Sequence, residues 1–152
     1  MAPEADFYDI PVEKVMNCNP PLIEEDASIR EVAQKVCTAT HVWVVEGKES
    51  RKIIGMITEK DLLDVVSPLP LKSYTVGVIM PKSLHHAEFK KAGDIMTELV
   101  SECHPKTTIE EALRLMAKHR VRRLAVTEND EIVGELTLNI LITVYFSLGD
   151  DL

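Results

Sequence analysis

The chain has 152 residues, 45% of them hydrophobic and 28% charged, which is the composition of a globular protein and favours one compact domain or two very small ones. Its formal net charge of −8 disfavours general binding to nucleic acid or to an anionic membrane. Residues 1–9 are acidic and do not resemble a signal peptide, no apolar run is long enough to span a bilayer, and the three cysteines form no CxxC pair, so a reduced cytoplasmic setting is expected.

A helix is predicted to begin after Ser28. The Ser28 hydroxyl can cap its first turn, and Glu31, three residues later, can complete a capping box. The apolar residues that follow have helical spacing, which predicts one buried face. They are Ile29, Val32, Ala33, Val36 and Cys37. Cys37 is therefore expected to lie in the hydrophobic core rather than to act as a nucleophile.

Two short strands are predicted next, at residues 42–45 and 53–57, with a polar turn between them. The first is a β-branched run that contains Trp43, which is expected to be a core residue. Thr58 follows the second strand and can cap a closing helix.

Residues 67–90 are predicted to form a linker, because this stretch contains three prolines, a glycine and the pair His85-His86. Its apolar part, residues 76–80, is expected to pack on the body of the protein.

The same elements then recur. Thr108 and Glu111 form a second potential capping box, and the apolar residues after Thr108 again share one helix face. They are Ile109, Ala112, Leu113, Met116 and Ala117. Predicted strands at residues 123–126 and 132–136 follow, and Thr137 can cap a second closing helix.

These landmarks recur at nearly one offset, which indicates a duplication. Met16 and Met96 are 80 positions apart, as are Ser28 and Thr108, and Gly55 and Gly134 are 79 apart. The sequence predicts a mixed α/β fold of the α+β type. Two βαββα repeats, residues 10–66 and 91–147, are joined by the linker 67–90. A repeat of this size buries too little surface to be stable alone, so the two are expected to pack together.

The repeated motifs resemble a tandem pair of cystathionine β-synthase (CBS) domains, an arrangement called a Bateman module. The matching features are the Val-Met and Ile-Met pairs at residues 15–16 and 95–96, the Ser/Thr-Ile-x-Glu helix starts, the Val-Val-Glu strand end at 44–46 and the Gly-x-x-Thr-x-x-Asp run at 55–61. The resemblance covers residues 10–65 and 91–146, which is most of the chain.

The resemblance implies two repeats packed with pseudo-twofold symmetry, and often a homodimer of such pairs. Clefts between the repeats commonly bind an adenine nucleotide such as AMP, ADP or ATP, and in some members S-adenosylmethionine. Binding usually regulates another protein, which is expected to be separate from this chain. No cofactor or metal is expected.

The resemblance also assigns candidate ligand residues. In the first repeat, Gly55, Thr58 and Asp61 keep the family's motif, with the hydroxyl near a phosphate and the carboxylate near the ribose hydroxyls. A carboxylate suits a vicinal diol because it has two acceptor oxygens. In the second repeat, Gly134 and Thr137 are present, but Ile140 stands where the acid belongs, so one ligand site per chain is expected.

The family's phosphate contacts point to residues 119–124 of the second repeat. Arg122 and Arg123 match the contact positions, and His119 and Arg120 are possible supports. A guanidinium group binds phosphate bidentately and stays charged. The prediction is therefore a composite site in which Asp61 and Thr58 of one repeat converge with the arginine pair of the other.

Other interpretations remain open. Asp61 can also be a solvated residue or pair with Lys60 or Lys52, and the arginines can be a solvated face or a partner surface. The middle strands lack the proline often seen in the family, where Trp43 and Ala125 stand instead. A protein-interaction or oligomerisation module and an S-adenosylmethionine-binding pair are therefore alternative functions.

An enzyme is ranked lower than these alternatives. The sequence shows no nucleophile–base pair and no glycine-rich phosphate loop, and Cys103 next to His104 is not a dyad signal. The five histidines lack the spacing of metal ligands.

Overall fold

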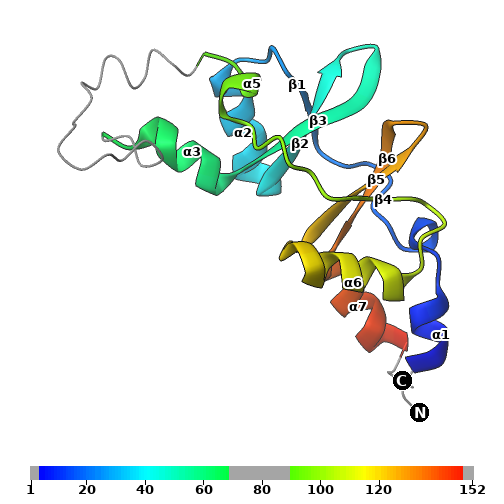
Figure 1. Ribbon diagram of the computed structural model, residues 1–152. Coiled ribbons are helices and arrows are strands. Elements are labelled where there is room, and N and C mark those ends of the chain that lie inside the picture. Colours follow the sequence, from blue (N-terminus) through cyan, green and yellow to red (C-terminus); the bar gives the residue numbers. More distant parts are fainter. Residues whose placement is uncertain (1–3, 69–89, 149–152) are drawn as a thin grey trace. The chain divides into compact units, whose positions relative to one another are not determined.

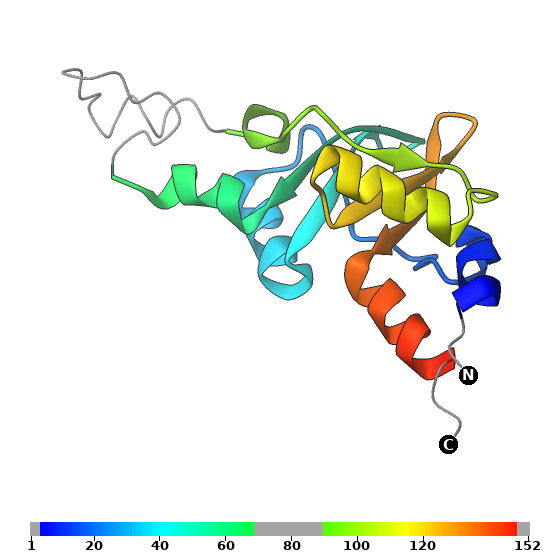
Figure 2. The same ribbon diagram turned by 60° about the horizontal axis from the view of Figure 1, so that its bottom comes forward.

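The computed structural model describes residues 4–68 and 90–148, which belong to two compact units (Figures 1 and 2). The central unit consists of residues 21–99, and the terminal unit combines residues 1–20 with residues 100–152. The predicted packing of residues 76–80 and the pair His85-His86 lie outside the described residues.

The central unit is a three-stranded sheet with helices on one face. Strand β1 runs parallel to β2, and β2 runs antiparallel to β3. Its elements are β1 (Leu22–Glu24), α2 (Ile29–Ala39), β2 (His41–Gly47), β3 (Ser50–Thr58), α3 (Glu59–Val66) and α5 (Ala92–Ile95). Val42 and Val44 point from β2 into a core with Val32 and Val36 of α2, as the alternation of a strand and the spacing of a helix require. Leu62 of α3 packs against the same core.

The terminal unit repeats this arrangement and adds a helix. Strand β4 runs parallel to β5, and β5 runs antiparallel to β6. Its elements are α1 (Glu4–Asp9), the 3₁₀ helix η1 (Val12–Lys14), β4 (Glu102–Cys103), α6 (Ile109–His119), β5 (Arg123–Glu128), β6 (Glu131–Thr137) and α7 (Leu138–Leu148). Its core includes Ile109 and Met116 of α6, Leu124 of β5 and Leu136 of β6.

Helix α1 is not predicted by the sequence, yet it belongs to the terminal core. Phe7 is buried, and its ring packs edge to face on Tyr145 of α7 with the centroids 5.1 Å apart. Figure 1 shows α1 beside α7. The first residues of the chain therefore contribute to the same core as the last helix.

The predicted fold class and the βαββα order of both repeats are confirmed. The helix starts are also as expected, because Ser28 Oγ accepts the Glu31 N–H at 3.2 Å and Thr108 Oγ1 accepts the Glu111 N–H at 3.2 Å. Two predicted core residues are wrong: Cys37 and Ala117 are both exposed. Each lies in the last turn of its helix, and Cys37 lines a groove between α2 and α3.

Each unit contains the opening segment of the sequence repeat that forms the other unit. The first lead-in segment (residues 10–19) pairs with the start of α6, where the Val12 N–H donates to Thr107 O at 2.7 Å. The second lead-in segment (residues 90–99) pairs in the same way with the start of α2, where the Ala92 N–H donates to Ala27 O at 2.8 Å. The two contacts occupy matching positions of the duplication.

The lead-in segments make a second matching contact, on β3 and β6. Thr97 and Met56 exchange two backbone hydrogen bonds of 2.8 and 3.0 Å, and Asn17 and Glu135 exchange two of 2.9 and 3.0 Å. Buried backbone groups need such partners. The compact units therefore differ from the sequence repeats, because each unit is completed by the first residues of the other repeat.

Among residues 4–68 and 90–148, no helix combines the length and the apolar character needed to cross a bilayer.

The close approach of the second lead-in segment explains Gly55. A Cβ atom at this position would lie 2.6 Å from Met96 Sδ and 3.0 Å from the Thr97 carbonyl oxygen, whereas a Cβ on Gly47 would meet nothing within 4 Å. We expect Gly55→Ala to lower the free energy of unfolding by about 1–3 kcal/mol, because the added methyl overpacks this contact. Gly47→Ala, the matched control, should stay within about 0.5 kcal/mol of the parent protein. Urea unfolding measures both, and equal midpoints would show that the lead-in segment yields without cost.

Candidate ligand site

The run from Gly55 to Asp61 forms the junction between β3 and α3. Thr58 has extended backbone angles and is the N-cap of α3. The Asp61 Oδ2 atom accepts the Thr58 N–H at 2.9 Å, and the Thr58 hydroxyl lies 3.4 Å from the same oxygen. The threonine and the acid of the motif therefore form a helix cap, which is a structural role in addition to any role in binding.

Asp61 is also tied to the second lead-in segment. The Thr97 hydroxyl donates to Asp61 Oδ1 at 3.3 Å, and the Asp61 side chain is only 7% exposed. The interpretation of Asp61 as a solvated residue is therefore wrong. Sequence reasoning missed Thr97. Its position directly after Met96 makes it the counterpart of Asn17 in the duplication.

The second repeat builds the same junction without an acid. Thr137 Oγ1 accepts the Ile140 N–H at 3.1 Å, so the threonine alone caps the first turn of α7. Ile140 packs against the terminal core, and Asn139 is exposed. Neither residue replaces the missing carboxylate, and Ile140 stands where the sequence analysis notes the loss of the acid.

The first lead-in segment contributes a different polar pair to this second junction. Asn17 Nδ2 donates to Glu135 Oε2 at 3.0 Å, and Glu135 is 4% exposed. Gly134 permits the approach, because a Cβ there would lie 2.6 Å from Met16 Sδ. Sequence reasoning missed this pair too, since nothing local links residues so far apart in the chain.

The residues predicted to contact phosphate lie at the end of α6 and at the start of β5. Arg123 is half-buried and is the register partner of Thr137, and the exposed Arg122 accepts the Leu138 N–H on its backbone oxygen at 2.9 Å. Arg120 is exposed and ends α6 with a left-handed backbone, φ 56°. The imidazole Nδ1 of His119 lies 2.9 Å from Ser101 Oγ.

The structure thus places the candidate residues in two groups, one in each unit. Thr58 and Asp61 stand together in the central unit, and Arg123 and Thr137 stand together in the terminal unit. The convergence of Asp61 with the arginine pair stays a prediction.

In the central unit, His41 occupies the position in β2 that Arg123 has in β5, and Trp43 follows two residues later. His41 is the register partner of Thr58, and Trp43 is the partner of Met56. Both side chains are buried, and their rings meet edge to face at 5.9 Å. The burial of Trp43 agrees with the sequence analysis, and His41 replaces the arginine found at the matching place in β5.

Cys103 and the possible metal ligands were also candidates for chemistry in the sequence. Burial raises the pKa of the Cys103 thiol to about 12, so it is protonated and unreactive near neutral pH. Within the described ranges, 4–68 and 90–148, no group of three or more His, Cys, Asp or Glu side chains could hold a metal ion.

Residues 12–68 and 92–147 each match the family model of the CBS domain. These matches cover most of the chain, and the protein therefore belongs to the CBS domain family, with the two domains in tandem. The resemblance noted in the sequence is confirmed.

Two curated relatives support this assignment. The uncharacterized protein YlbB of Bacillus subtilis is 30% identical over 94 residues, which are 62% of this chain and 53% of YlbB. The uncharacterized protein MJ0450 of Methanocaldococcus jannaschii is 27% identical over 138 residues, 90% of this chain and 66% of that protein. The chain thus spans about half to two thirds of the length of these relatives.

Solved structures share the fold. CBSX2 in complex with AMP has a TM-score of 0.74 at 20% identity, with 92% of this chain and 98% of that chain covered. The acetoin utilization protein AcuB from Vibrio cholerae, described as putative, has a TM-score of 0.71 at 22% identity, covering 91% and 92%. The CBS domain pair of MJ0100 in complex with 5′-methylthioadenosine and S-adenosyl-L-methionine has a TM-score of 0.66 at 19% identity, covering 90% and 99%.

The hydrogen bonds of Asp61 predict its effect on stability. We expect Asp61→Ala to lower the free energy of unfolding by about 1–3 kcal/mol, because it leaves the Thr58 N–H and the Thr97 hydroxyl without their acceptor. Asp61→Asn keeps one acceptor oxygen and should fall between the parent and the alanine variant. Urea midpoints of the three proteins test this order, and an alanine variant as stable as the parent would contradict the structural role.

Proposed function

We propose that this protein is a regulatory module that binds AMP, ADP or ATP between its two CBS domains. The observation that supports this most is the fixed carboxylate of Asp61 at the start of α3. Its two oxygens already have defined directions, because the helix cap and Thr97 hold them. A pre-positioned carboxylate is a suitable acceptor for the two hydroxyls of a ribose.

In this proposal, Thr58 and the first turn of α3 lie near the phosphate, because free N–H groups at a helix start favour an anion. Gly55 allows the backbone to pack closely there. Arg122 and Arg123 supply the positive charge, and His119 and Arg120 are secondary candidates. The contribution of these four residues is proposed from the family resemblance.

Chemistry favours a nucleotide over the runner-up ligand. AMP, S-adenosylmethionine and methylthioadenosine all contain adenosine, so a carboxylate that binds ribose suits each of them. Only the nucleotides carry phosphate, which an arginine pair binds well and a sulfonium ligand does not require. An S-adenosylmethionine-binding pair is therefore the second candidate, supported by the ligands named for MJ0100.

We further propose that the protein acts in the cytoplasm without catalytic activity of its own, and that ligand binding controls another protein. The structure of α7 also supports self-association. Ile142 and Phe146 lie one turn apart on this helix and are 50% and 67% exposed. A second copy of the chain is the proposed cover for this apolar pair, giving a homodimer of CBS pairs.

Ligand binding should raise the melting temperature. A nucleotide at a hundredfold excess over its Kd adds about 2.7 kcal/mol, which corresponds to a rise of about 5–10 °C for a chain of this size. We expect Asp61→Asn and Arg123→Gln each to reduce this rise strongly. Arg114→Gln, which removes a surface arginine paired with Glu110, is the matched control and should keep it.

The pattern of responses separates the candidates. A rise with S-adenosylmethionine and none with AMP, ADP or ATP supports the second candidate. No rise with any of these ligands defeats both, and leaves a protein-interaction module.

The homodimer proposal predicts a mass in solution of twice 17.0 kDa. Phe146→Asp places a charge in the centre of the apolar pair and should shift the protein to monomer. Ser147→Asp adds the same charge at the neighbouring exposed position and should leave the dimer intact. Light scattering coupled to size exclusion measures the three masses, and a monomeric parent protein would refute the proposal.

A further inference from the structure

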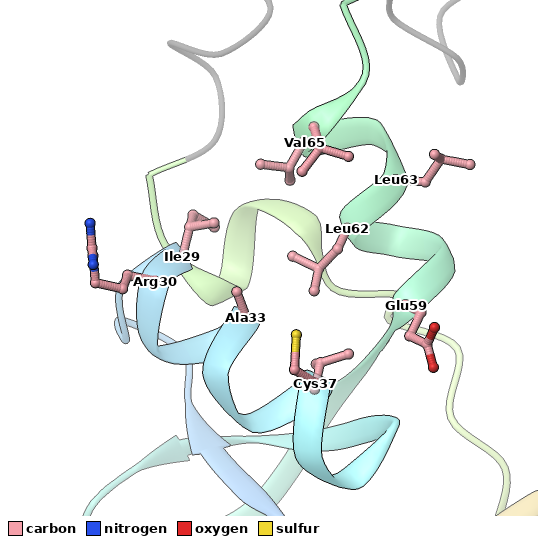
Figure 3. A pocket seen from close by; sticks show the side chains of 10 residues that line it. Ile29, Arg30, Ala33, Cys37, Glu59, Leu62, Leu63 and Val65 are labelled. Carbon is pink, nitrogen blue, oxygen red and sulfur yellow. The ribbon is translucent and has the colours of Figure 1, made fainter.

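An apolar groove of about 690 Å³ lies between α2 and α3 of the central unit (Figure 3). Ala33 and Val36 of α2 and Leu62 of α3 line it, and Leu63 and Val66 of α3 are 51% and 72% exposed. Large apolar side chains gathered around a hollow indicate a surface that receives another apolar group. This groove belongs to one unit, and Glu59, which directly follows Thr58, lines one end of it.

The two helices run in opposite directions along the groove. Figure 3 places Ile29, at the start of α2, near Val65, close to the end of α3, and it places Cys37 and Glu59 at the opposite end. The groove therefore has one end where α2 begins and α3 finishes, and another where α2 finishes and α3 begins.

The linker leaves and rejoins the central unit at the first of these ends. Helix α3 finishes at Val66, and the chain is described again from Lys90. Lys91 then forms an antiparallel bridge with Ser28, the N-cap of α2, directly before Ile29 of the groove. The described chain thus stops at Pro68 and resumes at Lys90 beside the same end of the groove, with 21 residues between them.

We propose that residues 76–80 of the same chain dock in this groove. Their sequence, Val-Gly-Val-Ile-Met, is free of charged and polar side chains. The eight residue steps from Pro68 to Val76 can span up to about 26 Å when extended, whereas the eight residues of α3 are about 12 Å long. The apolar run can therefore reach any point of the groove.

Tethering favours this occupant over a second copy of the chain. A short connection within one chain gives the attached segment an effective concentration on the order of millimolar, far above the protein concentration in a usual experiment. The entropic cost of closing a loop also grows only slowly with its length. A second copy would have to displace a segment that is always present.

Cys37 provides the test, because its exposed thiol lines the far end of the groove. In a Cys18→Ser background it is the reactive thiol to follow, since Cys103 is buried and its pKa is raised to about 12. We expect Val78→Asp with Ile79→Asp to increase the rate of Cys37 labelling by a maleimide at least tenfold. Ser73→Asp with His85→Asp adds the same charge to the same linker outside the apolar run and should leave the rate unchanged.

The labelling is measured without nucleotide, so its outcome does not depend on the proposed ligand. Equal labelling rates in the parent and both variants would overturn the docking proposal. A labelling rate of the parent that rises on dilution would also overturn it, because protection that depends on concentration indicates a second copy in the groove.

Disulfide trapping gives an independent measurement. In the same Cys18→Ser background, Val78→Cys should form an intrachain disulfide with Cys37 under mild copper-phenanthroline oxidation, and Ser73→Cys should do so at least tenfold less. Products that are crosslinked only between chains would overturn the proposal.

Discussion

The fold depends on the exchange of the two lead-in segments. Each segment supplies backbone hydrogen-bond partners to one strand, β3 or β6, and to the start of one helix, α2 or α6. These elements belong to the other sequence repeat. The hydrogen bonds between Thr97 and Met56 and between Asn17 and Glu135 fix this exchange in both units. It brings the methionine of each segment against a glycine, and it brings Thr97 to Asp61. Neither repeat could form its junction in the same way without the first residues of the other, so the two repeats complete each other and are not independent folds.

The comparison of the two junctions separates what the fold needs from what a ligand needs. Both keep the glycine and the threonine, because the lead-in methionine requires the space and the helix start requires a cap. In the second junction, however, Ile140 takes the place of the acid and α7 still begins at the same point. A strand–helix turn of this kind can therefore form without a carboxylate, as Thr137 shows. At Asp61 the carboxylate caps α3 and also accepts from Thr97, so the first junction combines a structural role with the geometry that a ribose would require.

Much of the fold is predictable from sequence because its signals are local. Caps at Ser28 and Thr108, the β-branched runs and the 80-residue offset define the elements and their order. The exchange of segments is not local, so the roles of Thr97 and Asn17 could not be read from spacing. Helix periodicity also failed at its ends: Cys37 continues the apolar stripe of α2 but is exposed, because α3 packs beside α2 and leaves a groove there. Thr58 and Asp61 of the motif meet at one junction, and their hydrogen-bond partners required the structure. Their role in ligand binding stays a prediction.

The exchange would also couple binding of the proposed ligand to the second lead-in segment, because Asp61 contacts that segment. A ribose bound by Asp61 would add hydroxyl donors to a carboxylate that already accepts from Thr97. A ribose could weaken or strengthen the hydrogen bond from Thr97 to Asp61, and either change would alter the stability of the contact between the second lead-in segment and α3. That segment continues directly from the linker, whose start follows α3, the helix that Asp61 itself caps. The linker therefore follows α3 and precedes the second lead-in segment, and both of these elements contact the Asp61 carboxylate. Because a ligand shifts an equilibrium only through differential contacts with its states, this shared carboxylate is the place in the central unit where occupancy and linker position would be coupled.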